Sequence, residues 1–170
     1  MLEEILSPAD CARCEFCCSF RRQSRHLTPY FAKESIEEIR RLYPGARFVT
    51  RENGGVTIDL EGQYHTQEDT EEALCYFNHK GCVLPEELKP FDCSLWPFRL
   101  MKKGEDLVLA LVPSCPWIKT EDTAKLKEVA AAMAKEAYFY AKTHPEIIIE
   151  YRDDYAVVAR VAGDGSCEEP

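Results

Sequence analysis

The chain has 170 residues, of which 45% are apolar, enough to build one ordinary hydrophobic core. Its 21 basic and 30 acidic residues give a formal net charge of −9, which argues against nucleic acid and anionic membranes as partners. No apolar run approaches the roughly 20 residues of a membrane span. We therefore predict one soluble domain over residues 1–162, followed by a polar tail over residues 163–170.

The first ten residues predict the compartment. They contain three acidic residues and no long apolar run, which is unlike a secretory signal peptide. We therefore expect a cytoplasmic protein, in which thiols stay reduced and disulfides are rare. Nine cysteines in such a chain indicate metal binding rather than a disulfide framework, with redox-active thiols as the less favoured alternative.

The N-terminal cysteine motif, residues 11–18, places Cys11, Cys14, Cys17 and Cys18 within eight residues. Two thiols separated by two residues can bind one centre when the backbone turns between them. Because Cys17 and Cys18 are adjacent, we expect one of them to join Cys11 and Cys14 and the other to face a second site or to pack. The basic segment that follows, residues 19–26, either neutralises this anionic centre or forms a solvated loop.

A helix, a hairpin and a loop are predicted next. The helix begins either at Thr28, which precedes a proline, or at Ser35, which opens a capping-box pattern, and it ends at Pro44. Apolar residues on both sides of residues 53–55, Asn-Gly-Gly, predict a β-hairpin. Residues 61–72 are polar and acidic, and we expect an exposed loop.

The second group of cysteines begins with a short knuckle between Cys75 and Cys82, where Gly81 allows a left-handed backbone. Cys93 lies among prolines and large aromatic residues, which could exclude water from a metal centre or form an ordinary core. Cys115 lies between prolines at a predicted strand end.

The C-terminal half predicts a hairpin, one long helix and a second hairpin. The pattern places these elements at residues 99–101 with 107–112, at residues 121–143, and at residues 147–151 with 155–161. Cys167 lies in the polar tail, and we expect it not to bind metal. The predicted fold class is α+β, with short antiparallel hairpins, two main helices and a cysteine-rich metal-binding lobe.

Eight cysteines are thus candidate metal ligands: Cys11, Cys14, Cys17, Cys18, Cys75, Cys82, Cys93 and Cys115. They could make two four-ligand sites, or one site with spare thiols. Thiolates suit zinc and iron–sulfur clusters alike. No phosphate-binding glycine loop or dinucleotide fingerprint occurs, so no catalytic residue is predicted.

Cys-x-x-Cys-x-x-Cys-Cys, followed by Cys75, Cys82 and Cys93 with Trp96-Pro97 just beyond, resembles the YkgJ-type cysteine-cluster family. The resemblance covers about residues 11–98 and implies a domain that chelates zinc or iron. The same module is found in flagellin lysine N-methylases, where it is associated with an iron–sulfur cluster and S-adenosylmethionine. Three hypotheses follow. The first is a protein that binds a metal ion or cluster, with a protein partner as a further possibility. The second is a cluster-dependent enzyme of protein lysine methylation or redox chemistry, and the third is a transient metal-delivery protein that uses the same ligands.

Overall fold

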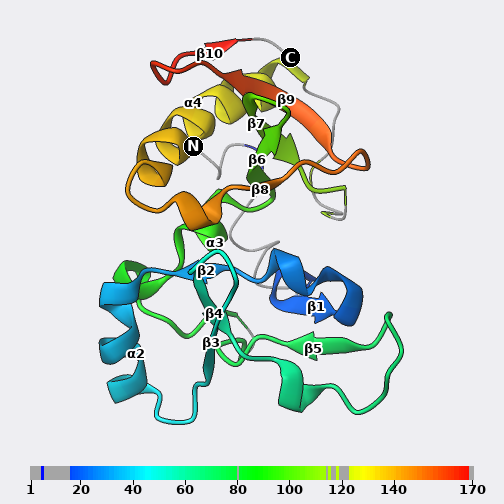
Figure 1. Ribbon diagram of the computed structural model, residues 1–170, viewed down its shortest axis with the longest axis vertical. Helices are drawn as coiled ribbons and strands as arrows, with labels where there is room; N and C mark the ends of the chain where they lie inside the picture. Colours follow the sequence, from blue (N-terminus) through cyan, green and yellow to red (C-terminus); the bar gives the residue numbers. More distant parts are fainter. Residues whose placement is uncertain are drawn as a thin grey trace. The chain divides into compact units, whose positions relative to one another are not determined.

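The computed structural model describes residues 5, 16–79, 81–113, 115, 118 and 123–168 (Figure 1). These residues form two compact units: the N-terminal unit, with the described residues of 16–94, and the C-terminal unit, with those of 95–168 and residue 5. Both units combine helix with antiparallel strands, so the predicted α+β class is confirmed. The chain therefore divides where the sequence predicts one domain over residues 1–162, because each unit buries its own hydrophobic core.

A three-stranded antiparallel sheet lies in the N-terminal unit. Its strands, in spatial order, are β2 (Tyr30–Phe31), β4 (Val56–Ile58) and β3 (Phe48–Thr50). The β3–β4 hairpin confirms the prediction from the Asn-Gly-Gly sequence. Its turn holds Gly54 at a φ of 81°, a conformation that glycine adopts without steric cost.

Helix α2 (Ile36–Leu42) begins directly after Ser35, the second of the two predicted starts. Thr28 leads instead into β2, whose Phe31 is buried and only 2% exposed. The buried face of α2 is made by Ile36 and Ile39. Tyr30 and Phe31, which follow Pro29, thus form a strand, because burial of these two aromatic residues in the core outweighs the local helix signal.

The second sheet of this unit has two antiparallel strands, β1 (Ser19–Arg21) and β5 (Glu72–Leu74), with Phe20 opposite Ala73. In Figure 1 these strands run side by side. The predicted exposed loop, residues 61–72, therefore contributes the first residue of a strand. Short 3₁₀-helical segments fill much of the rest of the unit: Phe16–Cys18, Arg22–Leu27, Lys33–Ser35, Glu61–Gln63 and Glu86–Leu88.

Phe77 is the centre of the N-terminal core, and its ring is 2% exposed. Four aromatic rings surround it, with centroid separations between 5.4 and 6.4 Å: Phe31, Tyr43, Phe48 and Tyr76. Such tilted and edge-on contacts are favourable beyond the burial of apolar area. Phe77 therefore anchors the segment between Cys75 and Cys82 in the core of the unit.

The C-terminal unit contains a five-stranded sheet in the order β10-β9-β7-β6-β8. Its strands are β6 (Phe98–Lys103), β7 (Asp106–Leu111), β8 (Ile149–Glu150), β9 (Ala156–Val161) and β10 (Cys167–Glu168). The β6–β7 hairpin is the one predicted from the sequence, with Gly104 at a φ of 63° in its turn.

The predicted last hairpin is wrong. Strand β8 pairs with β6, in parallel, while β9 pairs antiparallel with β7. The two strands therefore lie on opposite sides of the β6–β7 hairpin in the sheet order. The physical reason is that α4 (Thr123–Ala141) intervenes between β7 and β8, and such a crossover connection allows parallel pairing.

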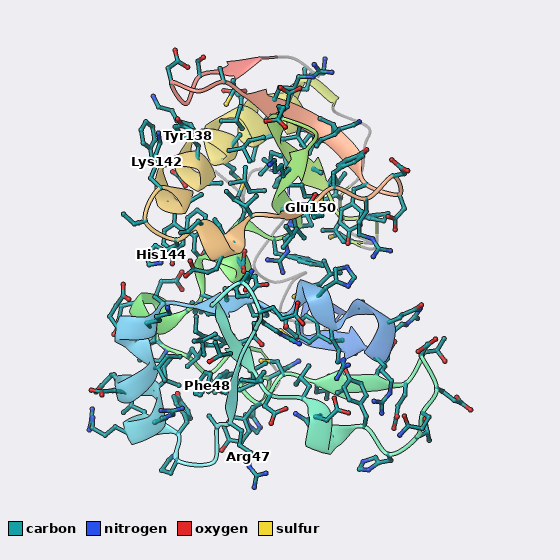
Figure 2. The ribbon with its side chains drawn as sticks, in the orientation of Figure 1. Arg47, Phe48, Tyr138, Lys142, His144 and Glu150 are labelled. Atoms are coloured by element: carbon teal, nitrogen blue, oxygen red, sulfur yellow. The ribbon has the colours of Figure 1, made fainter. Side chains whose placement is uncertain are left out.

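Helix α4 confirms the long helix predicted over residues 121–143. It contacts β9 and presents small, fully buried alanines, Ala130, Ala134 and Ala137, which let a helix approach a sheet closely. Figure 2 labels Tyr138 on this helix and Lys142 directly after its last residue, and the Lys142 ammonium lies 4.5 Å from the Tyr138 ring centre.

The predicted polar tail, residues 163–170, is in part a strand. A tight turn, closed by the Ala162 N–H donating to the Ser166 carbonyl at 2.8 Å, returns the chain to β9. Cys167 then pairs with Val161 in the sheet. Its thiol donates to the Ala131 carbonyl of α4 at 3.1 Å.

Candidate metal centre

The β1–β5 ladder brings two distant cysteines together. Ser19 is paired with Leu74, so Cys18 and Cys75 are the next residues along the two strands. The Cys75 N–H donates to the Cys18 carbonyl at 2.6 Å, which continues the ladder by one step. Backbone hydrogen bonds thus fix the end of the N-terminal cysteine motif beside the start of the knuckle.

Cys17 and Cys18 place their sulfurs 4.0 Å apart in the turn that precedes β1. Two sulfurs on one tetrahedral zinc, each bound at about 2.3 Å, are roughly 3.8 Å apart. The observed separation is therefore close to that of two ligands of one ion, whereas the sequence predicts that one of these thiols joins Cys11 and Cys14 while the other faces a second site or packs. Both residues are half-buried, which suits ligands that must remain accessible to an incoming ion.

Two thiols of this region hold their protons more strongly than an isolated cysteine. The hydrogen bond with the Cys18 thiol, and then burial, raise the pKa of Cys17 well above its ordinary value. Burial raises the pKa of Cys75 from 9.0 to about 11, with further increases from the charges of Cys82 and Cys17. Cys17, Cys75 and Cys82 therefore influence one another electrostatically. A bound cation would lower the pKa values of these thiols, because it favours the thiolates.

The knuckle between Cys75 and Cys82 is closed by its own hydrogen bonds. The Asn78 N–H donates to the Cys75 carbonyl at 2.9 Å, and the Asn78 side-chain oxygen accepts from the Gly81 N–H at 3.2 Å. Gly81 adopts a φ of 119°, which confirms the predicted conformation of this residue. These bonds return the chain, so that Cys82 pairs with Asn78 across an antiparallel bridge.

We expect Gly81→Ala to destabilise the N-terminal unit by about 1–2 kcal/mol, because a side chain at positive φ is strained. An added Cβ would meet no atom within 4 Å, so the cost comes from the backbone alone. Urea unfolding measures the change. Gly62→Ala is the matched control, since that glycine also has open space but no positive φ, and it should leave the stability unchanged or slightly raised. Equal effects at the two positions would contradict the explanation.

Cys93 and Cys115 lie in different units. Cys93 is an exposed residue of the short helix α3 (Phe91–Leu95) in the N-terminal unit. Its charge and that of Cys82 both contribute to raising the pKa of Lys89, after the larger effect of the Glu86 carboxylate. Cys115, half-buried, belongs to the C-terminal unit.

The remaining two candidate ligands are Cys11 and Cys14 of the N-terminal cysteine motif. Cys11 and Cys14 lie outside the residues that the structure describes. Over the described ranges, no three Cys, His, Asp or Glu side chains are arranged so as to hold a metal ion, and the seven described cysteines form no disulfide.

The basic segment pairs with the acidic loop that the sequence predicts as exposed. Arg21 bonds to Glu72, and Arg22 pairs with Glu71 at 3.6 Å. Glu61 accepts from both Arg22 and Arg25. The Arg21–Glu72 pair joins β1 to β5, and the other pairs join the residues that follow β1 to the acidic loop, a positioning role that sequence reasoning missed. The opposite charges of the two segments were the available signal.

Two observations bear on the protein as a whole. Within the described part of the chain, no helix is both long enough and apolar enough to cross a membrane. Compared with protein-family models, with curated proteins and with solved structures, the chain finds no match.

Proposed function

We propose that this protein binds a metal ion or an iron–sulfur cluster through cysteine thiolates of its N-terminal unit. The observation that carries the proposal is the hydrogen bond between Cys75 and Cys18, which joins the two cysteine groups across the β1–β5 ladder. The residues that would hold the group are Cys11, Cys14, Cys17, Cys18, Cys75, Cys82 and Cys93.

The donor chemistry fits such a group. Soft thiolates, with no carboxylate among them, select zinc or iron–sulfur clusters over magnesium or calcium. The half-buried thiols of Cys17 and Cys75 are neutral at physiological pH without a cation, since their pKa values are raised. Bound zinc would supply structural stabilisation, of about 10–16 kcal/mol in small zinc domains at neutral pH. The three-residue strands β1 and β5 are too short to be stable alone, so such a crosslink would stabilise the ladder between them.

Metal analysis of the full chain, purified without oxygen, tests the proposal. We expect about one equivalent or more of zinc in a colourless protein, or iron with acid-labile sulfide in a brown protein. The two results distinguish the two kinds of centre, and both support thiolate ligation. A protein that contains neither metal after expression, and takes up neither on reconstitution, would refute the proposal.

We expect the affinity for zinc to rise with pH from mildly acidic to alkaline solution. Binding requires thiolates, and in the metal-free protein the Cys75 thiol keeps its proton up to a pKa of about 11. Protons therefore compete with the metal, and lowering the pH releases it. Competition with a chromophoric chelator at several pH values, corrected for protonation of the chelator, measures the affinity. An affinity independent of pH would show that thiols do not bind the metal.

A further inference from the structure

A pocket of about 570 Å³ lies within the N-terminal unit, and Cys75 is one of its lining residues. Its size falls in the range of about 300–1,000 Å³ that is typical of small-molecule sites. The knuckle contributes one wall, with Cys75 and His79, and residues that follow β4, among them Asp59 and Gly62, contribute another. Arg47, which precedes β3, completes the charged lining. The pocket therefore combines both signs of charge with a thiol.

Arg47 and Asp59 face each other across the β3–β4 hairpin. The Asp59 N–H donates to the Arg47 carbonyl at 2.8 Å, one step beyond the pairing of Phe48 with Ile58. Residues opposite one another in a ladder project from the same face, with Cβ atoms about 4.5–5.5 Å apart. Figure 2 labels Arg47 and Phe48 as neighbours at this end of β3.

These two opposite charges do not bond to each other. In the described residues, the Arg47 guanidinium makes no ion pair, and the Asp59 carboxylate uses Oδ1 to accept from the Glu61 N–H at 2.9 Å. Four other described arginines of the unit do form ion pairs: Arg21, Arg22, Arg25 and Arg41. A cation and an anion that line one pocket, each with bonding capacity left, match a ligand that carries both charges.

We propose that this pocket binds a free amino acid, with its carboxylate at Arg47 and its ammonium group at Asp59. A guanidinium presents paired N–H donors that match a carboxylate. A simple anion would face the Asp59 carboxylate, and a simple cation would face Arg47, so each would meet repulsion that a zwitterion avoids. The rest of the pocket leaves room for a side chain against Leu74, Tyr76 and the amide of Asn78.

The proposal does not depend on the metal centre, although Cys75 belongs to both regions. The ligand is held by groups of the β3–β4 hairpin and not by thiolates. Amino-acid binding and metal content can therefore be measured separately on the same protein. A protein that binds an amino acid but contains no metal would support this inference and refute the proposed metal function. A protein that contains metal but binds no amino acid would refute this inference and support the metal function.

The test is calorimetric titration of the full chain with each of the common amino acids in turn. We expect at least one to bind, and the one that binds is then compared with its α-keto acid, which lacks the ammonium group, and with its decarboxylated amine. Each analogue should bind at least about tenfold more weakly, as loss of a charge-assisted hydrogen bond predicts. Absence of binding by every amino acid, or equal binding by either analogue, would overturn the proposal.

Three variants locate the site. Arg47→Gln and Asp59→Asn each remove one charge, and the second keeps the oxygen that accepts from the Glu61 N–H; each should weaken binding at least about tenfold. Gly62→Leu should weaken binding, because Gly62 lines the pocket and a leucine there would take up space that the ligand needs. Arg41→Gln, an exposed arginine of the same unit, is the control and should bind normally. Unchanged affinity in all three variants would place the ligand elsewhere and overturn the assignment.

Discussion

Replacing Cys75 by serine is expected to remove the bound metal and to lower the melting temperature of the protein. Cys75 connects the two cysteine groups, since its N–H bonds to the Cys18 carbonyl and its thiol is influenced by Cys17 and Cys82. Serine keeps the backbone hydrogen bond but replaces a soft thiolate by a poor zinc or iron ligand. Because outer partners of a metal site already account for roughly 10- to 100-fold in affinity, we expect at least about 100-fold for a direct ligand.

Cys167→Ser is the matched control for this experiment. Cys167 lies in β10 of the C-terminal unit, and its thiol donates to the Ala131 carbonyl, a bond that a serine hydroxyl can also make. Metal content and melting temperature should both remain those of the unaltered protein. If Cys75→Ser retained its metal, or if both variants lost it equally, Cys75 would not be a ligand. Elemental analysis and thermal unfolding, performed on the same samples, provide the two readouts.

Phe77→Ala is expected to destabilise the N-terminal unit by about 3–5 kcal/mol, the usual cost of removing a buried phenylalanine ring. Phe77 is 2% exposed and is surrounded by four aromatic rings, so the variant leaves a cavity that its neighbours can fill only in part. Its carbonyl also accepts from the Val83 N–H at 3.0 Å, which anchors the returning strand of the knuckle. We therefore expect a weaker metal affinity as well, because Cys75 and Cys82 flank this residue.

Urea unfolding, followed by circular dichroism, measures the effect of Phe77→Ala. Phe139→Ala removes the same ring from a position that is 53% exposed on α4, and it should change the free energy of unfolding by less than about 0.5 kcal/mol. A loss below about 1 kcal/mol for Phe77→Ala would mean that the aromatic cluster is not the core of its unit.

Local signals predicted the local elements of this fold. The Asn-Gly-Gly sequence at residues 53–55 gave the β3–β4 hairpin, and helical periodicity gave α4. Gly81 was correctly expected to adopt a positive φ, because only glycine does so without strain. In each case the residues that determine the element are close together in the sequence, so a short sequence pattern is enough to predict it.

Pairings between distant segments were not predictable in the same way. Strands β1 and β5 have three residues each, too few to show a period, and their side-chain link is the Glu72 carboxylate, which accepts from Ser19 and Arg21 across the ladder. The parallel pairing of β8 with β6 was missed because adjacent strands usually form hairpins, and here α4 separates the partners in the chain.

At the candidate site too, the sequence predicts local features but not the pairing of distant segments. The sequence identifies which residue types can bind metal, and their spacing predicts a shared centre, but it does not reveal that the chain divides between Ser94 and Leu95. Cys115 therefore falls in a unit apart from Cys75 and Cys82. The ladder that places Cys18 beside Cys75 became evident only in three dimensions, since nothing near Cys75 in sequence points to Cys18.

The central claim is that thiolates of the N-terminal unit share one metal centre. X-ray absorption spectroscopy at the zinc or iron edge of the purified full chain tests it most directly, because the method counts the atoms bound to the metal. We predict at least three sulfur neighbours at about 2.3 Å. In the Cys75→Ser variant, any metal that remains bound should have one sulfur neighbour fewer. A first shell composed only of oxygen and nitrogen would contradict the account.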